Sequence, residues 1–456
     1  MNRNCKKSGQ TGLVFFPAFD WRITPTHPER EERLLYTRDQ IFEEGIMDLP
    51  QIREYKPRMA SCKDIARTHI CVPGVRDQVT EAHLISAGGA LALADALMAG
   101  EIRNGFAIIR PPGHHAMRVV HGNRGFCNIN NEAIMVDYLR KQYGLKRIAI
   151  IDTDVHHGDG TQDIFYHDPE VLFISFHQDG RTLFPGTGFT NETGGPTAFG
   201  RTLNVPMPVG TTDEGIHYIL DNLILPVLDE FKPELVINSA GQDNHFTDPL
   251  ANMKVTTQGY ARLNEKLRPD LAVLEGGYAI ETALPYLNTG IILAMAGMDY
   301  SNVVEPEYRP GMHKMSDEKM SLIIELVHEV RELWDRRNTI DLGALRAKND
   351  FFSRQKSIFY DTDGINEQQT ERLRLCPECG GYLSIVSQAY HYHGAPQNIL
   401  ALSIPFNGCH ECREEAYSEY EHGMDKKAYD YVYFQDRVSD TYRVYSREKD
   451  REREEI

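Results

Sequence analysis

The sequence predicts an α/β fold in which helices cover both faces of a mainly parallel, multi-stranded sheet. Short apolar runs that indicate buried strands alternate with longer helix-like stretches through residue 300. This alternation is typical of a parallel sheet, because each strand returns to the sheet through a covering helix. Reactive side chains follow several of these apolar runs, where open α/β sheets place their sites.

The elements follow one another regularly along the chain. Strands are predicted at residues 106–109, 148–151, 171–176, 234–239 and 271–274. Helices are predicted at residues 83–100, 131–144 and 213–231, and an amphipathic helix at 317–338 closes the series.

Four segments are expected. The main domain spans 1–345, and a polar, irregular linker over 346–370 follows it. A small cysteine-paired module over 371–415 comes next, and then a charged, tyrosine-rich tail over 416–456. The charge run of the tail is most simply a solvated helical face.

Composition excludes several classes of protein. A chain of 456 residues with 41% hydrophobic content can bury a large core. Its formal net charge of −17 argues against a nucleic-acid partner, which would favour a basic surface. No apolar run approaches the roughly 20 residues that span a bilayer. Eight cysteines in a chain of this length are not a disulfide scaffold. We therefore expect a cytoplasmic protein with neither a nucleic-acid nor a membrane partner.

The stretch "RIAIIDTDVHHGDGTQDIF" (147–165) places ionisable groups directly after an apolar strand. Asp152, Asp154 and His156 have the same parity, so they share a face if the chain stays extended. Carboxylates gathered in this way repel one another unless a cation lies between them. The stretch therefore predicts a metal site at a strand end.

Three other predicted strands end in similar chemistry. His114 and His115 follow one apolar run, Asp243 follows another, and Tyr278 follows a third after a Gly-Gly turn. Two aspartates and one histidine leave an open position on a metal, as catalytic zinc requires. A histidine pair can transfer protons, and a tyrosine can stabilise an oxyanion. Together these groups predict hydrolysis of an amide or ester.

At these residues the chain resembles the zinc-dependent histone deacetylases, in the wider family that includes acetylpolyamine amidohydrolases and acetoin-utilisation proteins. The resemblance covers roughly residues 12–300. Seven ordered motifs carry it: "HPEREERL" (27–34), "RPPGHHA" (110–116), "GFCNINN" (125–131), "DTDVHHGDGT" (152–161), "LFPGTG" (183–188), "SAGQDNHFTDP" (239–249) and "EGGY" (275–278). "RPPGHHA" is similar to the class II enzymes.

The resemblance implies a role for each site residue. The zinc ligands would be Asp154, His156 and Asp243. His115 would act as general base and then as general acid, with His114 as its electrostatic partner. Asp152 would hold His114, and Asp159 would hold His115. Tyr278 would help to stabilise the tetrahedral intermediate.

The resemblance also implies how the substrate is held. Phe126 and Phe184 would wall a narrow tunnel, and Gly125 would leave room beside it. Arg33 resembles the arginine that lines an internal acetate-release cavity. A potassium ion near Asp152–His156 and Ser175 is also implied.

Three positions depart from the family pattern. Asp159 stands where class II enzymes commonly have asparagine, which predicts a more basic His115. Gln242 replaces a usual aromatic or aliphatic residue beside a ligand. Leu250 stands where polyamine-selective relatives carry glutamate, which favours acyl-lysine as the substrate, with acetylpolyamines or other small amides as the alternative.

Two rival functions fit the sequence less well. Arginase-like hydrolases need two manganese ions and a paired aspartate, but Gly241 stands where the first of that pair would be. A non-catalytic acyl-lysine-binding scaffold would be expected to lack a ligand, a histidine or the tyrosine, and all are present. A deacetylase that acts on acetylated lysine of proteins is therefore predicted.

The C-terminal module carries a second metal motif. Cys376, Cys379, Cys409 and Cys412 form two CxxC pairs, which indicate a structural zinc site similar to a zinc ribbon. Iron in a rubredoxin-like knuckle is the alternative. The apolar stretch 398–406 suits packing against the main domain, another subunit (a homo-oligomer) or a protein partner.

Overall fold

The computed structural model describes residues 9–392, 395–426 and 428–455. An eight-stranded sheet forms the centre of the first domain, and every pair of neighbouring strands in it runs parallel. The strand order is β2-β1-β4-β10-β9-β6-β7-β8. The bounds are β1 Gln10–Phe16, β2 Ile52–Tyr55, β4 Ile102–Ile109, β6 Ile148–Asp152, β7 Val171–Gln178, β8 Thr202–Met207, β9 Leu235–Ala240 and β10 Leu271–Leu274.

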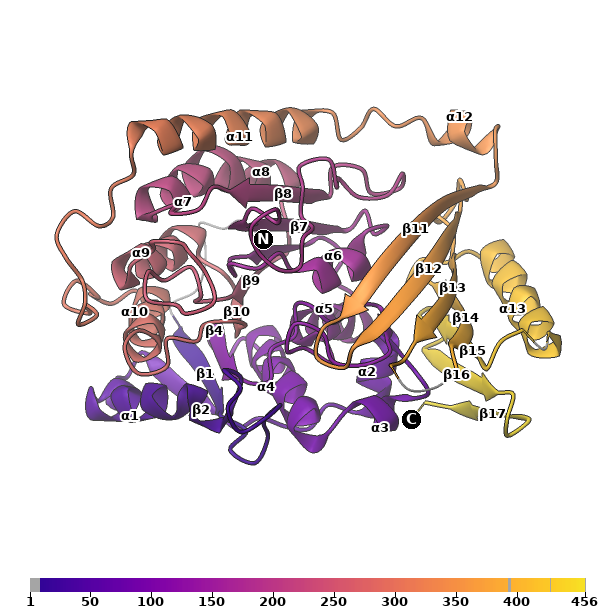
Figure 1. The fold of residues 1–456 in the computed structure, drawn as a ribbon, viewed down its shortest axis with the longest axis horizontal. Helices are drawn as coiled ribbons and strands as arrows, with labels where there is room; N and C mark the ends of the chain where they lie inside the picture. Colours follow the sequence, from indigo (N-terminus) through magenta and orange to yellow (C-terminus); the bar gives the residue numbers. More distant parts are fainter. Residues whose placement is uncertain (1–8, 393–394, 427, 456) are drawn as a thin grey trace.

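Helices cover both faces of this sheet (Figure 1), which confirms the predicted fold class. One face is covered mainly by α2 (Cys62–Thr68), α3 (Val75–Gln78), α4 (Glu81–Met98), α5 (Asn131–Tyr143) and α6 (Asp159–Phe165). The other face is covered by α1 (Leu35–Glu43), α7 (Asp213–Ile219), a π-helical turn (Leu220–Ile224), α8 (Leu225–Phe231), α9 (Thr257–Leu267), α10 (Leu284–Ala296) and α11 (Asp317–Asp335). Short 3-10 helices at Glu31–Leu34 and Ile46–Asp48 flank α1.

Strand β6 shows why the predicted strands are continuously apolar. Ile148 and Ile150 belong to the core on one face of the sheet, whereas Ala149 and Ile151 belong to the core on the other. Because both faces are buried, every position of the strand is apolar until Asp152.

A second domain follows and is larger than the predicted module. Its sheet has the order β11-β12-β13-β14-β15-β16-β17, with antiparallel pairs except for β14 and β15. The bounds are α12 Leu342–Arg346, β11 Phe351–Tyr360, β12 Ile365–Arg374, β13 Leu383–Tyr390, β14 Gln397–Ile404, α13 His410–Asp425, β15 Tyr431–Asp436, β16 Thr441–Ser446 and β17 Arg451–Glu454.

The expected linker over 346–370 is wrong, because β11 and the first half of β12 occupy most of it. Alternate residues of β12 are buried, as in an ordinary strand, but they include Glu367 and Glu371. An inward face that is charged hides the alternation of apolar and polar residues by which a strand is recognised.

The boundaries at 371 and 416 also differ from the structure. Residue 371 lies inside β12, and residue 416 lies inside α13, so the module and the tail form one sheet. The charged end expected to be helical is instead β17, which pairs with β16.

The two domains share a buried apolar cluster. Strands β3 (Ile70–Cys71) and β5 (Val119–Val120) form a small parallel sheet in the first domain. Ile70 and Val119 pack with Leu373, Ile385 and other residues of the second domain. In the part of the chain that the structure describes, no helix is long and apolar enough to cross a bilayer.

Candidate active site and four-cysteine cluster

Four neighbouring strands carry the predicted site residues. β4, β10, β9 and β6 lie side by side in the sheet, and the chain leaves their carboxyl ends toward His114, Tyr278, Asp243 and Asp154 respectively. Residues that are far apart in sequence are therefore delivered to one edge of the sheet.

Asp154, His156 and Asp243 form one compact group. Their nearest donor atoms all lie within 4.8 Å of one another. His156 Nδ1 is 3.1 Å from Asp154 Oδ1 and 3.1 Å from Asp243 Oδ2. The carboxylates are buried and oriented by backbone amides, because Gly276 N donates to Asp154 and Val155 N donates to Asp243.

Turns, rather than an extended strand, bring the ligands together. β6 ends at Asp152, so the extended chain on which the shared-face prediction depended does not continue. Asp154 N donates to Asp152 Oδ1 at 3.1 Å, and His156 N donates to Asp154 Oδ1 at 2.8 Å. These side-chain-to-backbone turns leave Asp152 beside His114 and direct Asp154 toward Asp243.

The group has the electrostatic character of a cation site. Burial alone lowers the pKa of His156, but hydrogen bonds and charges from Asp154 and Asp243 outweigh it and raise the pKa to about 10. A positive charge is therefore stabilised at this point, which a divalent cation would supply more fully. Two carboxylates and one imidazole also suit zinc chemically. The residues fit the metal that the sequence predicts.

Glycines let the backbone approach this group closely. A Cβ atom at Gly241 would lie 2.1 Å from Asp154 Oδ2, and one at Gly276 would lie 2.1 Å from Asp243 Oδ2. A second carboxylate at position 241, as a paired-metal site would need, has no space in this packing.

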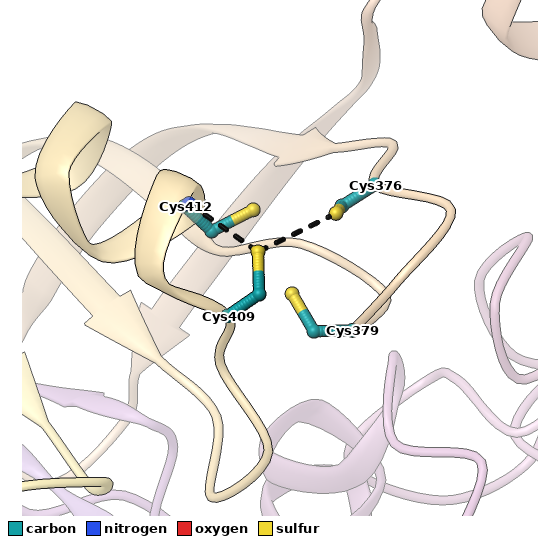
Figure 2. Close-up of side chains that lie close together, drawn as sticks. All are labelled: Cys376, Cys379, Cys409 and Cys412. Carbon is teal, nitrogen blue, oxygen red and sulfur yellow. Dashed lines mark hydrogen bonds between the residues drawn. The ribbon is translucent and has the colours of Figure 1, made fainter.

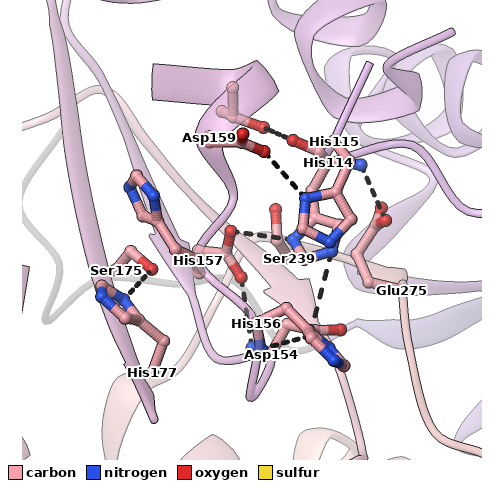
Figure 3. Close-up of polar contacts among 12 residues, drawn as sticks. His114, His115, Asp154, His156, His157, Asp159, Ser175, His177, Ser239 and Glu275 are labelled. Carbon is pink, nitrogen blue, oxygen red and sulfur yellow. Dashed lines mark hydrogen bonds and ion pairs between the residues drawn. The ribbon is translucent and has the colours of Figure 1, made fainter. Parts of the chain in front are cut away.

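His114 and His115 stand beside Asp154 and His156 (Figure 3). Their pKa values are shifted in opposite directions. Burial opposes protonation of His114, but the charges of Asp154 and Asp152 outweigh it and hold its pKa well above the ordinary value. Burial holds the pKa of His115 well below the ordinary value, and the His114 charge adds to this effect.

Each ring is oriented by the aspartate that the resemblance implied. His114 Nδ1 lies 3.2 Å from Asp152 Oδ2, and His115 Nδ1 lies 2.8 Å from Asp159 Oδ1. A His115 that is more basic than with asparagine at position 159 stays a prediction. Arg124 forms a 2.6 Å ion pair with Asp159, so the carboxylate charge is shared with a cation that itself disfavours protonated His115.

Tyr278 closes one side of the site. Its backbone N donates to Asp248 at 2.7 Å, and its ring packs edge-on against Phe126. Arg33 stacks over the ring 4.8 Å from its centroid. Arg33 is fully buried and pairs with Glu29 at 2.7 Å. An acetate-release role for Arg33 stays a prediction.

A cavity of about 260 Å³ opens above these groups. Its aromatic walls are Phe126 and Phe184, and the other predicted residues that line it are His114, His115, Gly125, Asp154, His156, Leu250 and Tyr278. Gly125 has a φ of 53°, and a Cβ there would lie 2.3 Å from the His115 ring. Glycine is thus required beside His115.

Sequence reasoning missed three residues of this region. Arg124 holds Asp159, Glu275 accepts backbone hydrogen bonds from Gly113 and His114, and Asp361 lines the cavity. Glu275 and Arg124 lie inside or beside quoted motifs. Asp361 had no signal, because it lies in the segment predicted to be a linker.

Two further expectations concern neighbours of the site. Ser175 Oγ hydrogen-bonds to His177 Nδ1 at 2.8 Å, and potassium there stays a prediction. Gln242 turns away from the ligands and donates to Asn288 at 2.6 Å, so it takes part in core packing.

The four cysteines of the second domain converge as predicted (Figure 2). Cys376 and Cys379 lie in the loop after β12, and Cys409 and Cys412 lie at the start of α13. Their sulfur atoms all lie within 4.8 Å of one another. Four sulfurs at this separation suit a tetrahedral metal, and they form a second group that shares no residue with the first.

Comparison with known proteins identifies the family. The histone deacetylase domain matches residues 71–294. A probable deacetylase of Archaeoglobus fulgidus is 44% identical over 352 residues, covering 71% of this chain and 96% of that protein. This chain belongs to the histone deacetylase family, and it is therefore a hydrolase of the deacetylase type.

Two further matches agree with this assignment. Histone deacetylase 14, chloroplastic, of Arabidopsis thaliana is 42% identical over 213 residues, covering 44% of this chain and 49% of that protein. The crystal structure of the HDA15 HD domain superposes with a TM-score of 0.62 at 26% identity, covering 75% of this chain and 99% of that one.

Proposed function

We propose that this protein is a zinc-dependent deacylase that removes acetyl, or another small acyl group, from lysine side chains of proteins. The observation that carries the proposal is the convergence of Asp154, His156 and Asp243 beneath two oriented histidines at the base of an aromatic-walled cavity. A zinc ion held by those three residues supplies a Lewis acid and lowers the pKa of water.

The chain's own residues handle the protons. Asp159 engages His115 Nδ1, so Nε2 is the ring nitrogen left to accept a proton from water. The low pKa of His115 keeps this nitrogen unprotonated at neutral pH. The same nitrogen returns the proton to the departing amine. His114, held by Asp152, lies against the His115 ring and acts as its electrostatic partner.

Tyr278 and the aromatic walls position the acyl group. The Tyr278 hydroxyl donates a hydrogen bond to the oxyanion of the tetrahedral intermediate. Phe126 and Phe184 enclose an aliphatic stem and exclude water from it. The pocket thus suits an acylated amine at the end of a long apolar chain.

A small acetylated polyamine is the second candidate substrate. Polyamine deacetylase HDAC10 of Mus musculus is 39% identical over 209 residues, covering 43% of this chain and 31% of that protein. The exposed carboxylate of Asp361 at the cavity favours a cationic substrate of this kind. Leu250, an apolar lining residue, favours acyl-lysine instead.

Turnover of acetyl-lysine peptides by wild type and Tyr278→Phe tests the proposal. Loss of the phenol should lower kcat by about a hundredfold or more, since one oxyanion donor contributes on that scale. Tyr300→Phe, at a half-buried tyrosine that does not line the cavity, is the matched control and should keep wild-type turnover. Zero turnover by zinc-loaded wild type across acetyl, longer acyl and polyamine substrates would favour a binding scaffold instead.

A further inference from the structure

The second domain reaches the catalytic cavity through one hairpin. β11 and β12 are joined by a turn at residues 361–364, and the hairpin lies against the first domain (Figure 1). Asp361, in this turn, lines the cavity together with His115, Phe126 and Tyr278. A residue of the appended domain is thus part of the wall of the candidate active site.

The hairpin holds the backbone beside Gly125 and Phe126. Tyr360 OH donates to Val119 O at 3.0 Å, and Asn123 N donates to the Asp363 carboxylate at 2.6 Å. Arg124 Nε donates to Phe359 O at 3.1 Å. These contacts, all from a short stretch of the hairpin, fix the segment that precedes the aromatic wall.

Asp361 completes this set of contacts. Gly125 N donates to Asp361 Oδ1 at 2.8 Å, directly beside Phe126. Gly125 and Phe126 both have left-handed backbone conformations, with φ of 53° and 69°. For Phe126 this conformation is strained, and such strain persists only when neighbouring contacts hold it.

The charge of Asp361 distinguishes it from the rest of the cavity. Among the described residues that line the cavity, the acidic ones are Asp154 and Asp361. Asp154 is buried at the metal group, whereas Asp361 is exposed and so lies at the open side. The hydrogen bond to Gly125 uses one of its two oxygens, and a carboxylate can accept further bonds through the other.

The cation directly before Gly125 does not cancel this charge. Arg124 pairs with Asp159 at 2.6 Å and is buried, so it does not offset Asp361 at the opening. A substrate that enters the cavity therefore passes a negative charge supplied by the second domain.

We propose that Asp361 is a specificity-determining residue that favours substrates with a positive charge near the acylated amine. The inference rests on the proposed deacylase function and adds a substrate preference to it. The charge could come from a lysine or arginine next to an acyl-lysine in a peptide, or from a second ammonium group in an acetylated polyamine. Both sources offer the same chemistry to the carboxylate.

Asp361→Asn isolates the charge, because asparagine retains an oxygen that can accept the Gly125 hydrogen bond. Asp363→Asn is the matched control, since its carboxylate sits in the same turn and holds Asn123 but does not line the cavity. Each full-length protein is assayed with three acetyl-lysine peptides, flanked by arginine, alanine or glutamate, and with a monoacetylated polyamine.

Wild type should prefer the arginine-flanked peptide to the glutamate-flanked peptide. Asp361→Asn should reduce this ratio of kcat/KM by about two- to fivefold, the scale of an exposed charge pair, mainly through KM. High salt should shrink the wild-type ratio and leave that of the variant little changed. Asp363→Asn should keep the wild-type ratio, whatever its overall rate. If Asp361→Asn also lowers kcat/KM for the monoacetylated polyamine, the second ammonium group of that substrate is a second source of the same charge.

Equal ratios in wild type and Asp361→Asn would overturn the inference and leave Asp361 a purely structural contact of Gly125. Turnover of the alanine-flanked peptide reports on the proposed function separately, because that peptide carries no flanking charge. If wild type hydrolyses none of the substrates, binding of the labelled arginine- and glutamate-flanked peptides to the two proteins, measured by fluorescence anisotropy, still decides the role of Asp361.

Discussion

The ammonium group of Lys356 in β11 forms an ion pair with Asp163 of α6, which joins the two domains through charges that are almost fully buried. Glu371 of β12 lies 2.6 Å from the same ammonium group. The charges of Asp163 and Glu371 raise the pKa of Lys356 despite its burial, so the lysine stays protonated between them.

Lys356→Met should destabilise the protein by roughly 3 kcal/mol, because it leaves two buried carboxylates without their shared cation. The midpoint of urea unfolding measures the loss. Lys266→Met, which breaks a surface pair with Asp221, is the control and should cost about 1 kcal/mol or less. Similar midpoints for the two variants would contradict a buried ionic connection between the domains.

Metal content should report two independent sites. Zinc-loaded wild type should hold two ions per chain, one at Asp154, His156 and Asp243 and one at the four cysteines. The double variant Cys409→Ser, Cys412→Ser should lose one ion, and Asp243→Ala should lose the other. Elemental analysis by mass spectrometry measures both. Iron and a red colour at the cysteine cluster, or two ions remaining in the cysteine variant, would oppose this assignment.

Gly125→Ala should reduce kcat/KM by at least tenfold. Its new Cβ would lie 2.3 Å from the His115 ring and 2.9 Å from Phe184, so the general base and the wall must both move. Gly144→Ala is the matched control, because Gly144 also has a left-handed φ, of 69°, but nothing lies within 4 Å of the added atom. Both variants carry the backbone strain of about 1–2 kcal/mol, and only Gly125→Ala should lose activity.

Steady-state kinetics measures kcat/KM for Gly125→Ala and Gly144→Ala, and circular dichroism confirms that each variant is folded. Equal activities in Gly125→Ala and Gly144→Ala would show that the close packing beside His115 is not needed for turnover.

Asp440 should contribute stability that disappears in acid. Burial opposes its ionisation, but Tyr442, Arg67 and Lys63 outweigh that effect and lower its pKa to about 2, from an ordinary value of 3.8. Because the unfolded state binds the proton more readily, the contribution is complete at pH 5 and above and is lost as the pH falls toward 2. The carboxylate is partly exposed, so about 1 kcal/mol is expected after solvent screening.

The comparison of wild type with Asp440→Asn at a series of pH values isolates this contribution. The difference in unfolding free energy should be constant from pH 7 to pH 5 and then shrink. If the difference in unfolding free energy instead grows as the pH falls, Asp440 does not stabilise the protein through its ionised form.

Much of the first domain could be predicted from the sequence because its strands are buried on both faces. The continuous apolar run of β6 is visible without any partner, and the same holds for β10. The residues that stand within a few positions of the end of such a run followed, namely His114, His115, Asp152, Asp154, His156, Asp243 and Tyr278. The others, such as Asp159, Phe126 and Phe184, were implied by the family resemblance. Their roles, potassium binding and the cytoplasmic location stay predictions.

The second domain could not be predicted because long-range ion pairs replace apolar residues in part of its core. Glu371 and Lys356 satisfy each other only once β11 and β12 are paired, and Asp163 comes from a distant helix. Nothing local marks such a strand as buried. For the same reason Asp361 was missed, since its place at the cavity depends on this pairing.

The hairpin contacts have a consequence for protein synthesis. A ribosome that has completed the chain only as far as α11 has made all three residues of the Asp154, His156 and Asp243 group and both active-site histidines, yet Gly125 and Asn123 still lack the carboxylates that hold them. The entrance of the catalytic cavity is therefore complete only after the turn at 361–364 has left the ribosome and packed against the first domain.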